Sequence, residues 1–302
     1  DKLLQPCLKW VVSIDETCNS LMRIDIPRSS TPFFNEKQRL FTENQAALSA
    51  WIQRPFSKEA FLEQLTEKQH VFGASQRDLL QEGLEELYED VLRTEKVETN
   101  IEKLGQANCF TVTTGHQLSL ATGPLFFLYK ILHVIKQCEE LKASYPDYEF
   151  VPVYWMASED HDFAEIQSVS LFQQVLKWDR SQGGAVGRMN LDGLEAVISE
   201  IQTKFQNHPE SEIHSLMEAM SGETYGKAFL KFVNELFGHY GLIIIDGDLP
   251  LWKEAFSPIF KQELLSGFSA KAVERTNQSL SQAGFPLQVE AKDTNLFYLS
   301  PD

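Results

Sequence analysis

Three short polar runs follow apolar segments of this 302-residue sequence, and their side chains could carry chemistry. They are Thr113–His116, Glu159–Asp162 and Asp246–Asp248. Carboxylates bind ammonium groups or Mg²⁺, an imidazole can donate a hydrogen bond to a phosphate oxygen, and a glycine lets a phosphate approach the backbone. The runs therefore predict a site for a phosphorylated or amino-bearing small molecule.

The first run, Thr-Thr-Gly-His, has two interpretations. Its T-x-G-H spacing after a predicted strand resembles the run that class I nucleotidyltransferases use. In that case Gly115 would admit a phosphate next to the positive end of the following helix, and His116 would donate to it. Alternatively, Gly115 only forms a turn and His116 is a polar cap. The position between a strand and a helix favours phosphate binding.

The two acidic runs also have purely structural alternatives. Asp162 with Glu165 matches a capping box, which satisfies amides at the start of a helix without any ligand. A cap does not require Glu159, Asp160 and His161, so this run favours a site for Mg²⁺ or a substrate ammonium group. The third run is explained largely by an Asx turn, with contact to a ribose or Mg²⁺ as the alternative.

The elements that would position these runs alternate between strand and helix. Apolar, β-rich segments at 109–113, 149–155 and 242–245 predict strands, and apolar residues from Phe127 to Leu141 recur at helical spacing. Such alternation predicts an α/β fold with a parallel, doubly wound sheet.

Ligands of open parallel sheets bind beyond the carboxyl ends of the strands. We therefore expect the three runs to share one edge, with His116, Asp160 and Asp246 lining one pocket.

The rest of the chain suggests its domain organisation. Residues 1–105 are predicted to form a mostly helical N-terminal layer, and 106–302 a core with a helical insertion at about 168–238. A β-segment is expected at Asn295–Leu299, after which the sequence stops without a closing element, as in a fragment. Such a fragment should expose an apolar patch.

Composition excludes several classes of protein. The 43 acidic and 27 basic residues give a net charge of -16, which disfavours nucleic acid as a partner. No segment is apolar enough to span a membrane, so a cytoplasmic location is expected. The four cysteines lack C-x-x-C spacing and are expected to be reduced and mostly buried, and no metal ligand set is predicted. P-loop, α/β-hydrolase and dinucleotide-binding motifs are absent.

Two segments resemble the signatures of the bacillithiol biosynthesis cysteine-adding enzymes. The first runs from Thr113 to Leu125, with Lys130, and the second is Val-Pro-Val-Tyr-Trp-Met-Ala-Ser-Glu-Asp-His-Asp-Phe-Ala-Glu-Ile at 151–166. The strand Gly241–Asp246 and the segment Asn295–Tyr298 support the resemblance, which extends from about residue 100 to the end.

The resemblance implies a Rossmann-like core related to class I aminoacyl-tRNA synthetases. It also implies a ligase that joins the carboxyl group of cysteine to the amine of glucosaminyl malate, with ATP or ADP as the expected nucleotide and Mg²⁺ as its companion. The family continues into a C-terminal helical coiled coil that forms a homodimer, and that coiled coil is absent here.

The resemblance and the residue types together give a set of expected site residues. His116, Asp160 and His161 are expected to be catalytic. The expected nucleotide-binding residues are Thr113, Gly115, His116, Gly123, Asp246 and Asp248. The expected substrate-binding residues are Gln117, Trp155, Glu159, Asp160 and Asp162.

Two other functions remain open from the sequence. One is a different small-molecule adenylyltransferase of the same superfamily, which activation assays with cysteine and other carboxylates would separate. The other is a non-catalytic nucleotide-binding scaffold, in which the polar runs are only caps and turns.

Overall fold

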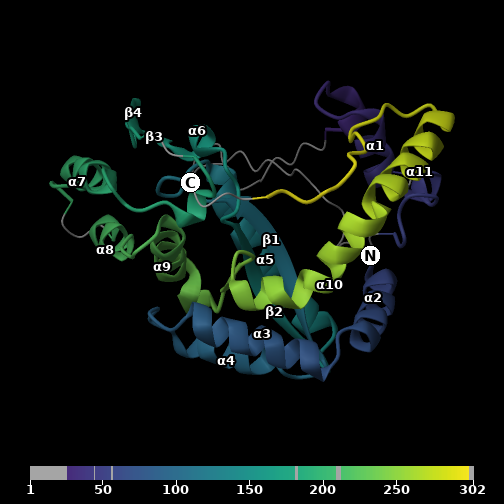
Figure 1. The fold of residues 1–302 in the computed structure, drawn as a ribbon, viewed down its shortest axis with the longest axis horizontal. Coiled ribbons are helices and arrows are strands. Elements are labelled where there is room, and N and C mark those ends of the chain that lie inside the picture. Colours follow the sequence, from purple (N-terminus) through teal and green to yellow (C-terminus); the bar gives the residue numbers. More distant parts are fainter. Residues whose placement is uncertain (1–25, 44, 56, 181–182, 209–211, 299–302) are drawn as a thin grey trace, which may run out of the picture. The chain divides into compact units, whose positions relative to one another are not determined.

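A computed structural model of the protein describes residues 26–43, 45–55, 57–180, 183–208 and 212–298, and Figure 1 shows their fold. The chain divides into two compact units. The first combines the residues up to 70 with 263–295, and the second comprises 71–262 and the residues from 296 onwards.

The first unit is built from helices of two distant parts of the sequence. The indole of Trp51 packs edge-on against Phe285, with ring centroids 5.6 Å apart, and its N–H donates to Ser279 Oγ at 3.2 Å. An aromatic pair of this kind contributes about 1 kcal/mol beyond the area that it buries. The elements are η1 (Arg28–Ser30), α1 (Glu36–Glu43), η2 (Gln45–Leu48), most of α2 (Lys58–Val71) and α11 (Phe268–Gln282).

A three-stranded parallel sheet lies at the centre of the second unit, as the sequence predicts. The order is β1-β2-β5, so β2 is the central strand. Residues Phe150 to Tyr154 are all buried because helices and loops cover both faces of a parallel sheet, which is why the strand reads as a continuous apolar run. The strands are β1 (Cys109–Gln117), β2 (Glu149–Ala157) and β5 (Ile243–Asp246).

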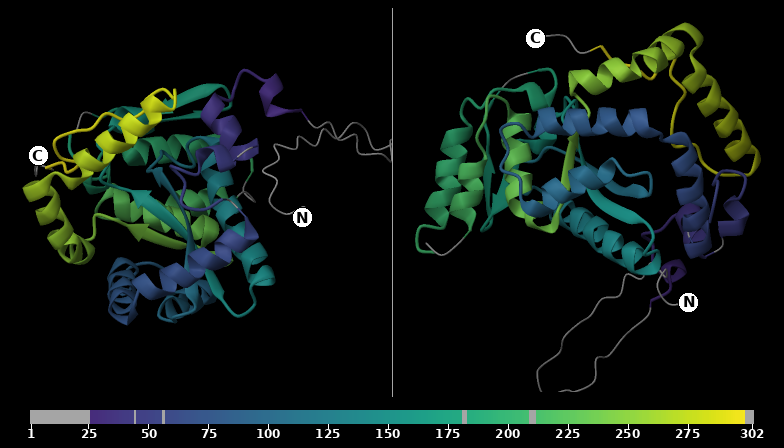
Figure 2. Two further views of the ribbon diagram at one scale, coloured as in Figure 1. Left: turned by 90° about the vertical axis from the view of Figure 1, so that its right-hand side faces the viewer. Right: turned by 90° about the horizontal axis from the view of Figure 1, so that it is seen from below.

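Helices pack on these strands, and Figure 2 shows the arrangement from two further sides. Helix α5 packs against β1 and β2, α9 packs against β5, and α3 and α4 lie side by side (Figure 1). The ring of Phe127 in α5 contacts both Tyr154 of β2 and Phe229 of α9, with centroids 5.5 and 5.9 Å apart. The helices are α3 (Ala74–Leu87), α4 (Glu95–Leu104), α5 (Leu125–Ser144), α9 (Tyr225–Phe237) and α10 (Pro250–Ser266).

A tyrosine that follows α3 provides a partner for the backbone of β5. Tyr88 is buried, and its hydroxyl accepts a hydrogen bond from the N–H of Ile244 at 2.8 Å. Burial raises the pKa of Tyr88, so the hydroxyl keeps its proton. The bond satisfies a backbone donor that would be costly to leave unpaired in the interior.

The described part of the predicted insertion at 168–238 contains a β-hairpin as well as helices. The sequence does not predict this hairpin, because its turn residues Phe172 and Gln173 adopt left-handed φ angles of 50° and 63° without the usual Asn-Gly or Asp-Gly signal. The elements are β3 (Ser168–Leu171), β4 (Gln174–Lys177), η3 (Val186–Arg188), α7 (Leu194–Lys204), α8 (Ile213–Ala219), α9 and η4 (Gly238–Tyr240).

Two expectations differ from the structure. The two compact units do not divide at residue 105, because α3 and α4 pack on each other and on the strands and so belong with the sheet. Asn295–Tyr298 form no strand, since none of the described strands pairs with them, and Leu299 lies outside the described residues. An extended segment needs a neighbouring strand to satisfy its backbone.

The described cysteines behave as expected. Cys109 and Cys138 are free and buried, and burial raises their pKa values to about 11 and about 12, which keeps both thiols protonated. Cys7 and Cys18 lie outside the described residues. None of the helices in the described part of the chain is long and apolar enough to cross a membrane.

Candidate functional site

The polar runs share one edge of the sheet because the three strands end at the same level. His116 of β1 pairs with Met156 of β2, and Met156 pairs in turn with Asp246 of β5. Adjacent strands lie about 4.8 Å apart, which places the backbones of His116 and Asp246 roughly 10 Å from each other. The expected common edge is therefore confirmed.

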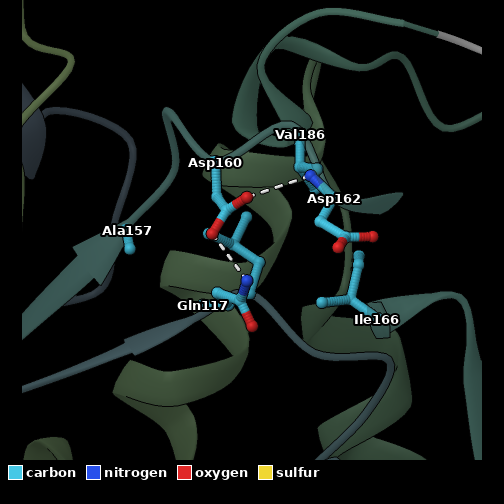
Figure 3. A pocket seen from close by; sticks show the side chains of 7 residues that line it. Gln117, Ala157, Asp160, Asp162, Ile166 and Val186 are labelled. Atoms are coloured by element: carbon cyan, nitrogen blue, oxygen red, sulfur yellow. Dashed lines mark hydrogen bonds between the residues drawn. The ribbon is translucent and has the colours of Figure 1, made fainter. Parts of the chain in front are cut away.

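A small pocket lies where β1 and β2 end, and Asp160 faces it (Figure 3). The Asp160 carboxylate accepts hydrogen bonds from Gln117 Nε2 at 2.5 Å and from the backbone N–H of Asp162 at 2.9 Å. Burial opposes ionisation, but these bonds and the neighbouring His161 outweigh it and lower the pKa of Asp160. The pocket thus contains an anion at neutral pH. Its lining residues are Gln117, Leu118, Ala157, Asp160, Asp162, Ile166 and Val186.

Asp162 caps the short helix α6 (Phe163–Ile166), as one of the two interpretations expects. Its side chain accepts from the N–H of Glu165 at 3.3 Å. The reciprocal half of a capping box is not formed, because the N–H of Asp162 donates to Asp160 instead. Capping and pocket lining thus coexist in this run, while His161 is exposed beside it.

His116 lies over the start of α5 and does not line the pocket. Its ring contacts Phe126 and Phe127, with centroids 5.1 and 5.7 Å apart. The Nζ of Lys130, also on α5, donates to the carbonyl oxygen of Gly115. An imidazole and an ammonium group therefore flank the end of β1, and both are groups that bind phosphate.

Strand β1 extends further than the sequence predicts and reaches Gln117. Thr113 pairs with Val153, and Thr114 to Gln117, which follow the predicted strand, are paired with β2 as well. At Gly115 a Cβ atom would lie 3.4 Å from the carbonyl oxygen of Trp155, which is an ordinary contact. The backbone itself does not require a glycine there.

Gly123, by contrast, is required by the turn that leads into α5. Its φ is +53°, and a Cβ atom there would lie 2.5 Å from Ser119 Cβ. Residues other than glycine rarely adopt such a positive φ, and none fits a Cβ atom this close to another carbon. This turn fixes where the first amides of α5 lie.

Asp246 is a partly buried carboxylate at the end of β5. Its Oδ1 accepts hydrogen bonds from Ser158 Oγ and from the N–H of Asp248, the latter at 2.9 Å. Burial raises the pKa of Asp246, although these bonds work in the opposite direction. Within the described part of the chain, no hydrogen bond reaches its second oxygen. Asp246 can therefore accept a proton or a ligand through that oxygen.

Asp248 is engaged by two cations. Arg188 binds it through two parallel hydrogen bonds, Nε to Oδ2 at 2.6 Å and Nη2 to Oδ1 at 2.7 Å, and Lys253 of α10 contacts the same carboxylate. Lys253 also pairs with Glu159 at 2.6 Å. Burial opposes ionisation of Asp248, but Arg188 and Lys253 outweigh it and lower its pKa. This ion network joins the ends of β2 and β5 to α10.

Trp155 is the exception to the burial of β2. Its indole lies against Gly247, in the turn between Asp246 and Asp248, and it is exposed while its neighbours in the strand are buried. The structure thus brings Gln117, Asp160 and Asp162 together in the pocket, and it joins Glu159 to Asp248 through Lys253. His116, Trp155 and Asp246 lie at the same edge but outside that pocket, so this pocket does not unite His116, Asp160 and Asp246 as expected.

Sequence reasoning missed Ser158, Arg188 and Lys253, which orient the acidic residues. The three positions are far apart in the chain, and no motif links them. The glycine-rich loop before Arg188 was a partial signal, because such a loop can mark a close approach of two backbones. At Gly187 a Cβ atom would lie only 2.5 Å from Ser158 Cβ.

The geometry defines an α/β domain with a polar site at the carboxyl edge of a parallel sheet. Residues 22–302 match the family described as "Bacillithiol biosynthesis BshC, N-terminal Rossmann-like domain". The chain belongs to this family, and its core is Rossmann-like.

Curated relatives agree with the family match. The chain is 40% identical over 225 residues to "Putative cysteine ligase BshC" of Cytophaga hutchinsonii, which covers 74% of this chain and 41% of the relative. It is 35% identical over 280 residues to the protein of the same name from Flavobacterium johnsoniae, covering 91% and 52%. For Flavobacterium psychrophilum the identity is 38% over 250 residues, covering 80% and 46%. The chain spans about half the length of these relatives.

Proposed function

We propose that this chain forms the nucleotide-binding and acceptor-binding part of a ligase that joins the carboxyl group of cysteine to the amine of glucosaminyl malate. The family description and the names of the relatives support this reaction class. The observation that carries the proposal is the ionised carboxylate of Asp160, held by Gln117 at the edge where a Rossmann-like sheet binds ligands. It offers a partner for a substrate ammonium group.

Amide formation from a free carboxylate is uphill in water, so the carboxyl group of cysteine must be activated. ATP would supply this activation as an acyl-adenylate or an acyl phosphate. His116 and Lys130, with the turn at Gly123 and the first amides of α5, are the groups that would bind its phosphates. The amine must then lose a proton, and we assign its acceptance to the open oxygen of Asp246.

The expected Mg²⁺ does not fit Asp248, because both oxygens of that carboxylate are engaged by Arg188 and Lys253. The described residues also provide no group of three or more histidine, cysteine or carboxylate ligands. A Mg²⁺ that accompanies ATP would bind mainly to phosphate oxygens. Asp246 is the carboxylate of the site that could add a protein oxygen to its ligands. No step of the proposal depends on it.

The test uses the full-length protein with ATP, cysteine and glucosaminyl malate. We expect a thiol product, and release of AMP or of ADP distinguishes the adenylate from the acyl phosphate. Asp160→Asn should lower turnover by about thirtyfold, about 2 kcal/mol, because it removes the charge that binds the amine. The melting temperature should stay close to that of the wild type, since the amide oxygen can still accept from the N–H of Asp162 and the amide NH2 can donate to Gln117 once the Gln117 side-chain amide turns over.

Asp162→Asn and Asp179→Asn are the matched variants. Asp162→Asn keeps a capping oxygen and should leave folding nearly unchanged, while its activity reports whether this carboxylate also binds substrate. Asp179 is exposed and forms a surface ion pair with Lys177, so its replacement should change neither property. Turnover of Asp160→Asn within twofold of the wild type would refute the substrate role of the pocket.

The proposal carries two further expectations, a homodimer and a cytoplasmic location. Light scattering of the full-length protein and fractionation of cells that express it test them separately from the chemistry.

A further inference from the structure

An exposed tryptophan lies within the otherwise buried central strand. Trp155 is 43% exposed, whereas Tyr154 and Met156 on either side of it are 0% and 1% exposed. Because β2 is the central strand, the indole projects from a face of the sheet in its middle and not at its border. A large apolar surface is thus open at the site itself, where its burial by a ligand would be favourable.

One glycine in β1 and one directly after β5 leave room for this ring. Gly115 pairs with Trp155 across β1 and β2, and a Cβ atom there would lie 3.6 Å from Trp155 Cδ1. At Gly247, after β5, a Cβ atom would overlap the benzene part of the indole. Any larger residue at 247 would therefore displace the ring, whereas an alanine at 115 would only touch it.

The surroundings of the ring are charged and rich in hydrogen-bond acceptors. The turn that touches the indole carries Asp246 and Asp248 on either side of Gly247, and Lys253 links Asp248 to Glu159. A sugar ring has apolar C–H faces and a rim of hydroxyl groups, and a hexosamine adds an ammonium group. An indole beside the open oxygen of Asp246 matches these features, whereas Asp248 and Glu159 are already paired with Arg188 and Lys253.

We propose that Trp155 is the surface on which the pyranose ring of a hexosamine-containing acceptor stacks. This inference rests on the proposed function and names the residue that would recognise the sugar part of the acceptor. The sugar would then lie where β2 and β5 end, beside Gly247. The phosphates would lie at the end of β1, where His116 and Lys130 are found.

The experiment measures binding of glucosaminyl malate and of ATP separately to the full-length protein by calorimetry. Trp155→Ala should weaken binding of glucosaminyl malate about tenfold, which corresponds to about 1.4 kcal/mol, and leave the affinity for ATP within twofold. Trp155→Phe should retain the affinity within about threefold, because a phenyl ring still provides an apolar face. Circular dichroism melting of each variant establishes that it is folded.

A second pair of variants moves the ring without removing it. Gly247→Ala should weaken binding of glucosaminyl malate by displacing the indole, whereas Gly115→Ala should weaken it less. Tyr240→Ala is the control for loss of an exposed aromatic side chain, because Tyr240 is 46% exposed and precedes β5 at the opposite edge of the sheet. Its replacement should leave both affinities unchanged.

Two results would overturn the inference alone. One is a Trp155→Ala protein that binds glucosaminyl malate as tightly as the wild type. The other is a Trp155→Ala protein that loses affinity for ATP but not for the acceptor, because the indole would then stack on the base. A wild-type protein that binds no hexosamine and forms no thiol product would overturn the proposed function and the inference together.

Discussion

Asp246 ends a buried strand with a carboxylate whose charge is only partly compensated. Ser158 and the N–H of Asp248 both donate to one of its oxygens, yet burial still raises its pKa. An ionised group in this position costs stability, because desolvation disfavours the charged form. Residues that reduce stability in this way are frequent at functional sites.

The raised pKa of Asp246 gives a prediction for Asp246→Asn. Because burial raises the folded-state pKa of Asp246, the contribution of this group to stability is fully present below the ordinary pKa of 3.8 and is lost as pH rises through the folded pKa. An asparagine cannot ionise, and its oxygen can still accept from Ser158. Asp246→Asn should therefore melt at a higher temperature than the wild type at pH 8, and the difference should vanish near pH 4.

Asp248→Asn is the matched variant with the opposite sign. Arg188 and Lys253 lower the pKa of Asp248, so this carboxylate stabilises the fold above its ordinary pKa, and that contribution is lost as pH falls through the folded pKa. Asp248→Asn should melt at a lower temperature than the wild type at pH 8. Melting curves across this pH range that show Asp246→Asn destabilised at pH 8 would contradict the account of Asp246.

The sequence identified the carboxylates of the site better than the groups that orient them. Asp160 and Asp162 stand in one acidic run directly after a strand, so local reasoning found them. Ser158 gives no signal as a single hydroxyl, and Lys253 reaches Glu159 from a helix that is remote in sequence. Contacts between distant segments depend on the fold, and local patterns do not encode them.

At the scale of elements, one buried arginine links the end of α4 to the start of β1. Arg77 of α3 is 4% exposed, and its Nη1 donates to the carbonyl oxygens of Leu104 at 2.9 Å and Cys109 at 3.1 Å. The first ends α4 and the second begins β1. The cation therefore satisfies carbonyl groups at the negative end of a helix.

Arg77→Met should destabilise the protein by about 3 kcal/mol, because it leaves buried carbonyl groups without partners. Arg77→Lys should cost less, since one ammonium group can still reach one or two of them. Urea denaturation followed by circular dichroism measures both. Lys227→Met, which breaks a surface pair with Glu223, should change the midpoint little. An unchanged midpoint for Arg77→Met would mean that water replaces the guanidinium.

Elements with a strong local pattern were predicted well. Short apolar, β-rich segments predicted β1, β2 and β5. The helical spacing of apolar residues from Phe127 to Leu141 predicted α5. The β3–β4 hairpin was missed because Phe172 and Gln173 are unusual residues for a left-handed turn. The prediction of a strand at 295–299 was wrong for Asn295–Tyr298. Apolar alternation specifies a strand only where another strand is available to pair with it.

For the whole molecule, the surface of α5 predicts behaviour in solution. Leu125, Phe126, Tyr129 and Leu132 are between 42% and 63% exposed and recur at helical spacing. Contiguous apolar side chains of this kind favour association. The expectation that this chain exposes an apolar patch is met at α5.

We expect this 302-residue chain to self-associate as its concentration rises, as measured by light scattering. Replacement of Leu125 and Tyr129 together by glutamate should reduce the scattering to that of a monomer, because charges oppose burial of the helix surface. Leu92→Glu is the control, since Leu92 is 84% exposed but is not part of this helix. A wild-type chain that stays monomeric would show that the exposed side chains of α5 do not suffice for association.

The hydrogen bond between Tyr88 and β5 has a consequence for how the sheet could grow. An added strand beside β5 would need the N–H of Ile244, which already donates to a hydroxyl buried in the core. Recruitment of a strand there would require Tyr88 to leave the interior, and that makes this border resistant to edge-to-edge polymerisation. On β1, at the other border, Thr111 and Thr113 are exposed. A strand that joined this sheet would therefore be expected beside β1 and not beside β5.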